Sequence, residues 1–112
     1  MATDGLHHAS VGDDAIVSII VIVSMCVMTP VIEEVFFRQY LWDKVAAISG
    51  RKGALILTSI FWTAVHFDNF PQHMLIILPF AIVFGFLRYN SQGISVTISA
   101  HMAMNVIGTI HI

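Results

Sequence analysis

The chain has 112 residues, of which 57% are hydrophobic and 11% are charged, and its formal net charge is −2. Soluble domains average roughly 45–50% apolar and about 25% charged residues, so a water-soluble domain of this composition would lack the polar surface that it needs. The net charge gives no basis for nucleic-acid binding, and we expect one domain that is solvated by lipid.

The sequence predicts an all-α, polytopic transmembrane bundle of about four spans over residues 15–112, after a polar and acidic tail over residues 1–14. The first span starts at Ala15, stays uncharged to Ile32 and continues past two glutamates to about Trp42. Three further apolar runs predict the other spans, at Gly53 to about Phe67, about Gln72 to Leu87, and Ile94 to Ile112. Turn-forming residues separate the spans, at Ser49-Gly50 and Gly53, Asp68 to Pro71, and Asn90 to Gly93. The middle two spans are short for a bilayer of about 30 Å, which needs roughly 20 residues.

The basic residues are distributed unevenly between the predicted loops. Three lie between the first and second spans and one lies between the third and fourth, namely Lys44, Arg51, Lys52 and Arg88. Because cytoplasmic loops are enriched in Lys and Arg, we expect these two loops inside and both termini outside. The expected location is a cell membrane, crossed several times, with a bacterial plasma membrane as the simplest case.

Charged or strongly polar side chains lie inside the predicted spans, at Glu33, Glu34, Arg38, His66, His101 and Asn105. A charged group at a helix centre costs at least about 2.5–3.5 kcal/mol, so such residues indicate a function. Counted at about 1.5 Å per residue from the nearest basic loop residue, Glu33, His66 and His101 lie roughly 16, 21 and 19 Å deep. One acid and two histidines from three spans are therefore expected within about 5 Å of the same level.

Helical spacing groups these residues further. His101 and Asn105 are four residues apart and share one face of their helix, and Glu34 and Arg38 have the same spacing and can form an ion pair. Glu33 lies about 100° around the helix from Glu34. We therefore expect Glu34 and Arg38 to organise the site, and Glu33 to face a cavity shared with the two histidines and the asparagine.

This set of side chains predicts a hydrolase without a covalent intermediate. A glutamate in an apolar environment can act as a general base on water, and a neutral histidine beside it can hold the same water. A second histidine and an amide can donate to the oxyanion of a tetrahedral intermediate. The chain contains neither G-x-S-x-G nor H-E-x-x-H, so neither a nucleophile elbow nor a zincin helix is indicated.

Two histidines and a carboxylate can also bind Zn²⁺ with an open fourth position, and zinc stays an alternative. We favour the metal-free site because the fourth span offers no acidic side chain to orient His101, as zinc-ligating histidines usually require. The remaining polar and aromatic residues are interpreted as structural. Phe61 and Trp62 are expected to make lipid or packing contacts, and Asp68 to form a turn. The single cysteine, Cys26, cannot form an internal disulfide.

Three motifs resemble those of the CPBP family of intramembrane proteases, which includes CAAX prenyl endopeptidases and bacteriocin-processing or immunity proteins. Glu33-Glu34-Val-Phe-Phe-Arg38 is similar to the family's E-E-x-x-x-R motif, Trp62-Thr-Ala-Val-His66 to its F-x-x-x-H motif, and His101-Met-Ala-Met-Asn105 to its H-x-x-x-N motif. They occur in the family's order, each on a hydrophobic span, and the resemblance covers about Pro30 to Ile107. Trp62 stands where the family usually has Phe.

The resemblance implies a membrane-embedded endopeptidase in which Glu33 and His66 activate water, His101 and Asn105 form the oxyanion site, and Glu34 and Arg38 support them. It fits a mechanism without a cofactor, with zinc as the alternative. It implies the lipid bilayer and a peptide or prenylated-protein substrate as partners, and the net charge argues against nucleic acid. Family members usually carry further helices before the first motif, so we expect a truncated or minimal family core, its missing helices supplied by a homo-oligomer or another partner. The alternative is a non-catalytic membrane immunity or binding protein of the same fold.

Overall fold

The computed structural model describes residues 11–68 and 70–110, and every regular element in these two stretches is helical. The elements are α1 (Val11–Val23), η2 (Ser24–Met28), α2 (Thr29–Glu34), η3 (Val35–Leu41), α3 (Trp42–Val65), α4 (Gln72–Tyr89) and α5 (Ser95–Ile110), where η marks a π-helical segment. The predicted all-α class is confirmed. Most of the predicted tail, and the predicted end of the last span at Ile112, lie outside the described residues.

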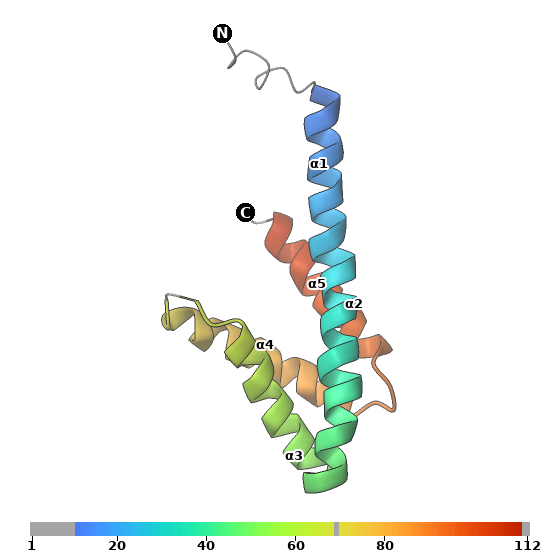
Figure 1. The fold of residues 1–112 in the computed structure, drawn as a ribbon, viewed down its shortest axis with the longest axis vertical. Helices are drawn as coiled ribbons and strands as arrows, with labels where there is room; N and C mark the ends of the chain where they lie inside the picture. The colour runs from blue at the N-terminus through green and yellow to red at the C-terminus, as the bar shows by residue number, and fades with distance from the viewer. Residues whose placement is uncertain (1–10, 69, 111–112) are drawn as a thin grey trace.

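A single helical rod runs from α1 to the first part of α3, and Figure 1 shows the chain reversing at its lower end. The rod starts before the expected Ala15, with Asp13 and Asp14 in its first turn, where negative charge favours a helix N-terminus. It also continues past the expected end near Trp42, because the reversal is at Gly50. Gly50 has φ 77° and ψ 177°, a conformation that is essentially restricted to glycine. Of the predicted turn residues, Gly50 makes this turn and Gly53 lies inside the following helix.

The connection between α3 and α4 is closed by Asp68, as its turn chemistry predicted. Its Oδ1 accepts a hydrogen bond from the Phe70 N–H at 2.8 Å, and its Oδ2 accepts one from His73 Nδ1 at 2.7 Å. The His73 hydrogen bond, followed by the Phe70 N–H, holds the pKa of Asp68 below its ordinary value. These bonds set where α4 begins relative to the end of α3.

The π segment η2 follows from Pro30, which lacks an N–H and crowds the carbonyl one turn before it. The N–H of Thr29 donates to Ser24 O, five residues back, and not to Met25 O. The Met25 carbonyl instead accepts a hydrogen bond from Asn105 Nδ2 at 2.7 Å. The irregular helix therefore offers a backbone acceptor to α5, which is one way that π segments serve functional sites.

The second π segment, η3, also leaves a backbone carbonyl without its ordinary helical partner. The N–H of Trp42 donates to the carbonyls of Phe37 and Gln39 and not to Arg38 O, its ordinary helical partner. Arg88 Nε donates to Arg38 O at 2.7 Å, while Arg88 Nη1 donates to Ser91 O at 3.1 Å. The end of α4 is thereby attached to the central rod.

The buried core lies where α3, α4 and η3 meet. Its cluster contains Phe37, Trp62, Ala81 and Phe84. The part of α3 that follows Gly50, called here its second arm, packs against α4. Helix α5 packs against α2, η2 and α4. In Figure 1 the second arm of α3 rises from the lower end of the rod, α4 runs back toward the rod, and α5 crosses it near the middle, while the N-terminal half of α1 extends beyond them. The fold thus brings residues from every predicted span to one place.

The outer surface is strongly apolar. On α1 the side chains of Ile16, Val17, Ile19 and Ile20 are 57–60% exposed. A helix that exposes large apolar side chains on several faces is suited to hydrocarbon and not to water. Two helical stretches of the described chain are long and apolar enough to cross a membrane, Gly12–Val65, which includes the reversal, and Gln72–Tyr89, whereas Ser95–Ile110 is apolar but shorter. The number of crossings stays a prediction.

Candidate active site

A cavity of about 910 Å³ opens between the rod, α3, α4 and α5. Most of its wall is apolar, with contributions from Ile76, Phe80 and Val83 of α4. Its polar lining comes from the other helices and includes Glu33, His66, His101 and Asn105. The structure therefore brings together the four residues that were expected to share a cavity. Glu34 and Arg38 are not part of this wall.

Glu34 and Arg38 form a buried polar group with His101 of the cavity wall, and the three side chains are 0%, 0% and 3% exposed. Glu34 Oε1 accepts hydrogen bonds from Arg38 Nη1 at 3.3 Å and from His101 Nδ1 at 2.9 Å. The first bond has the predicted spacing of four residues within one helix. The second joins α2 to α5 and fixes the orientation of the imidazole.

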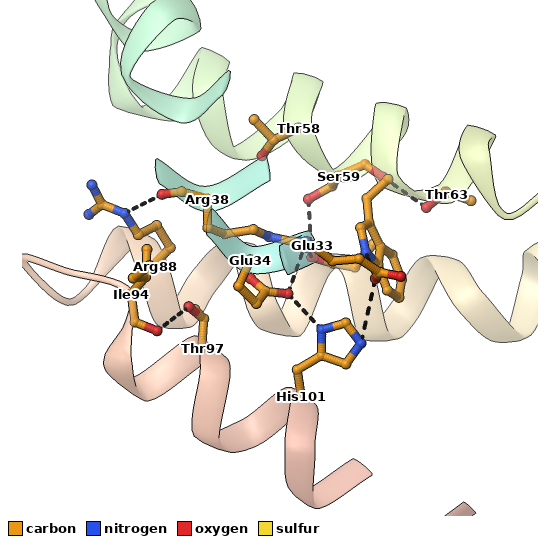
Figure 2. A network of polar contacts seen from close by, with 12 residues as sticks. Glu33, Glu34, Arg38, Thr58, Ser59, Thr63, Arg88, Ile94, Thr97 and His101 are labelled. Carbon is orange, nitrogen blue, oxygen red and sulfur yellow. Dashed lines mark hydrogen bonds and ion pairs between the residues drawn. The ribbon is translucent and has the colours of Figure 1, made fainter. Parts of the chain in front are cut away.

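Arg38 also contacts α3 and α4. Its Nη2 donates to Ala81 O in α4 at 3.0 Å, and Ser59 Oγ donates to the same carbonyl at 3.2 Å. The guanidinium carbon lies 5.3 Å from the ring centre of Trp62 and 5.6 Å from that of Phe84, within cation–π range. One cation thus links the rod to α3 and α4, and Figure 2 shows it extended between Glu34 and Ser59.

Glu33 is the carboxylate that reaches the cavity. Its Oε1 lies 3.8 Å from His66 Nε2, and its Oε2 lies 3.7 Å from His101 Nε2. Figure 2 shows the two ring nitrogens of His101 directed toward Glu34 and Glu33. Distances of this size are too long for direct hydrogen bonds and are suited to bridging by one water molecule.

The hydrogen bond that each histidine makes through Nδ1 indicates which ring nitrogen carries the hydrogen. His66 Nδ1 lies 2.6 Å from the carbonyl oxygen of Trp62, which can only accept, so this nitrogen carries the hydrogen. In the neutral ring His66 Nε2 is then an acceptor that faces Glu33. His101 Nδ1 donates to the Glu34 carboxylate, so its Nε2 becomes a donor toward the cavity only when the ring carries a second proton.

Asn105 lies on the same face of α5 as His101, one turn further along. One of its amide hydrogens is used by the Met25 carbonyl. An amide nitrogen has two hydrogens, so a second donor is available at the cavity wall. The π segment η2 therefore fixes the orientation of the Asn105 side chain.

The zinc alternative is tested by the same contacts. Each histidine has an acceptor on Nδ1 and directs Nε2 at Glu33, which is how zinc-ligating histidines are usually held. The expectation that no acid orients His101 is wrong, because Glu34 of the neighbouring helix does so, and counting along one span could not show it. However, the residues that the structure describes include no group of three or more His, Cys, Asp or Glu placed to hold a metal ion. The metal-free site stays a proposal, and chelation tests it.

Two residues of the site were not expected from the sequence. Trp62 was interpreted as a lipid or packing residue. The packing contact is confirmed, since Trp62 is 2% exposed in the buried core, but its Nε1 also donates to Glu33 Oε2 at 2.8 Å. Arg88 was interpreted as a basic residue of a loop, but it also caps the carbonyl of Arg38. Trp62 had one sign in the sequence, since an indole stands at a motif position where Phe is usual. The bond of Arg88 to Arg38 O had no sign, because the free carbonyl arises from helix geometry.

The fold and the site define an all-helical, apolar protein with a glutamate–histidine site inside its helices. The family described as type II CAAX prenyl endopeptidase Rce1-like matches residues 15–107. The chain therefore belongs to this membrane-embedded protease family, and the resemblance found in the motifs is confirmed at that level. No curated protein and no solved structure matches the chain.

Proposed function

We propose that the chain is an intramembrane endopeptidase that hydrolyses a peptide bond with water activated by Glu33. The observation that carries the proposal is the position of the Glu33 carboxylate, 3.8 Å from His66 Nε2 and 3.7 Å from His101 Nε2 at the wall of a mostly apolar cavity. Membership of a CAAX prenyl endopeptidase family supports a peptide or prenylated-protein substrate. A cavity with an apolar wall and a few polar groups suits such a molecule.

In this proposal one water molecule is held by two acceptors. Glu33 Oε1 and His66 Nε2 each accept one of its hydrogens, so its oxygen lone pair is directed away from them. Glu33 takes the proton as the oxygen attacks the peptide carbonyl carbon. The proton then passes to the nitrogen of the leaving amine as the tetrahedral intermediate collapses, which restores the carboxylate.

The oxyanion of the intermediate needs donors, and α5 is proposed to supply them. His101, which lies between the Glu34 and Glu33 carboxylates, donates from Nε2 when its ring is doubly protonated. The second amide hydrogen of Asn105 is the other donor. Because Glu34 and Met25 O hold these two side chains in place, little reorganisation is needed during reaction.

The test is a peptidase assay of the purified chain in lipid, with fluorogenic peptides in prenylated and unprenylated forms. Cleavage that requires Glu33 supports the proposal. Faster cleavage of the prenylated peptide would assign the substrate class.

Chelation separates the proposed mechanism from the zinc alternative. We expect exhaustive dialysis against a chelator to leave the hydrolysis rate unchanged, because the proposed steps use only Glu33, His66, His101 and Asn105. A zinc enzyme would lose activity and regain it with stoichiometric Zn²⁺. Metal content by mass spectrometry, measured before and after dialysis, checks that chelation was complete. Loss and recovery of this kind would overturn the metal-free mechanism.

We also propose that the chain crosses a cell membrane several times with both termini outside. The turn at Gly50 and the end of α4 at Arg88 would then face the cytoplasm, in agreement with the positions of the basic residues. In a Cys26→Ala background, a cysteine placed at Ser49 should be labelled only from the cytoplasmic side, and one placed at Gln72 only from outside. Labelling of both from one side would contradict the topology.

A further inference from the structure

Trp62 is a closely packed aromatic side chain beside the site. It is 2% exposed, and its ring lies edge-on to Phe84 with 5.8 Å between ring centres. The Arg38 guanidinium lies on it at 5.3 Å. The ring of His66 lies against it at 4.2 Å, and that of His101 meets it edge-on at 5.6 Å. These neighbours leave the indole little freedom to rotate.

Two polar atoms of Trp62 contact the proposed water-activating pair. The indole Nε1 donates to Glu33 Oε2 at 2.8 Å, and the backbone oxygen accepts from His66 Nδ1 at 2.6 Å. A buried indole N–H needs a hydrogen-bond acceptor, but this need alone does not explain why the acceptor is Glu33. One residue is bonded to both members of the pair.

The indole bond distinguishes the two oxygens of Glu33. Oε2 accepts the hydrogen bond from Trp62 and faces His101. Oε1 accepts no hydrogen bond from the described residues and faces His66 Nε2. The indole is a donor only, so the bond persists only while Oε2 acts as an acceptor. Protonation of the carboxylate is therefore directed to Oε1.

We propose that Trp62 is a positioning residue for Glu33: its indole N–H holds Oε2 and so presents Oε1 to the water shared with His66. This inference rests on the proposed function, since it assigns the reactive oxygen of the proposed base. It concerns a contact that exists whether or not the chain turns over substrate, so the contact and its catalytic effect are tested separately.

Nuclear magnetic resonance tests the contact. The chain has two tryptophans, so protein with ¹⁵N-labelled indole in lipid nanodiscs should give two Nε1–H signals, and Trp62→Phe identifies the one from Trp62. We expect Glu33→Ala to shift the Trp62 signal upfield in the proton dimension and to leave the Trp42 signal in place. An unchanged Trp62 signal would overturn the inference, even if the chain is inactive.

Kinetics tests the effect. Hydrogen bonds to charged groups contribute about 1.5–3 kcal/mol, so Trp62→Phe should lower kcat about 10- to 100-fold with KM unchanged. A benzothienylalanine at position 62 keeps the bicyclic shape but lacks the N–H, and it should lower kcat equally. Full activity of the benzothienyl protein would overturn the positioning role, because packing alone would then suffice. If the wild type shows no peptidase activity, the proposed function fails and the resonance experiment alone decides whether the contact exists.

Discussion

Glu33→Gln is expected to lower the rate of peptide hydrolysis about 10²–10⁴-fold while the protein stays folded, because removing a well-placed general base has effects of this size. Glutamine keeps the length of the side chain and can still accept the Trp62 indole hydrogen bond through its carbonyl oxygen. It cannot take a proton from water. The fold should be kept, since Glu33 is 22% exposed at the cavity wall and is not part of the buried core.

The matched control is Asp14→Asn, which removes one carboxylate from the exposed start of α1. Surface substitutions of this kind usually change stability by less than about 0.5 kcal/mol, so activity should stay within about twofold of the wild type. An active Glu33→Gln variant would exclude Glu33 as the base. A wild type that cleaves no peptide in any lipid would favour the alternative of a non-catalytic membrane binding or immunity protein.

The helices and the common depth of the polar residues could be predicted from the sequence, because both depend on the composition and spacing of residues that are close together in the chain. Uncharged runs and turn residues predicted where the helices lie. The end of α3 at Val65 and the limits of α4 differ from the prediction by only about two residues, which is within the usual scatter of helix ends. Counting residues from the basic loops predicted that Glu33, His66 and His101 lie at one level. The spacing of Glu34 and Arg38 predicted their contact, which lies within one helix.

The contacts between helices were not accessible in the same way. His101 could be assigned to a face of its helix, but the rotation of α5 against α2 decides that Nδ1 meets Glu34. Sequence spacing also assumes regular helices, whereas η2 and η3 shift the register and release the carbonyls that Asn105 and Arg88 bind. The first helix was predicted to end at about Trp42, but it continues to Gly50. Asp43 and Lys44 interrupt the apolar run without interrupting the helix, so hydrophobicity did not indicate the continuation to Gly50.

Arg38→Met is expected to destabilise the fold by about 3–5 kcal/mol, the usual cost of removing one partner of a buried ion pair. Glu34 is 0% exposed and would have only His101 as a side-chain partner. Ala81 O would lose one of its two side-chain donors, and the rings of Trp62 and Phe84 would lose their cation. The measurement is reversible unfolding in mixed micelles, followed by circular dichroism.

The double variant Glu34→Gln with Arg38→Met isolates the charge effect. A neutral amide at position 34 can still accept from His101 Nδ1 through its oxygen, so only the unpaired charge is removed. We expect the double variant to be more stable than Arg38→Met alone, with a coupling energy of about 0.5–3 kcal/mol between the two positions. A double variant that is less stable than Arg38→Met would mean that Arg38 acts mainly through Ala81 and the aromatic rings. Equal stability of Arg38→Met and the wild type would show that Arg38 does not hold the rod to α4.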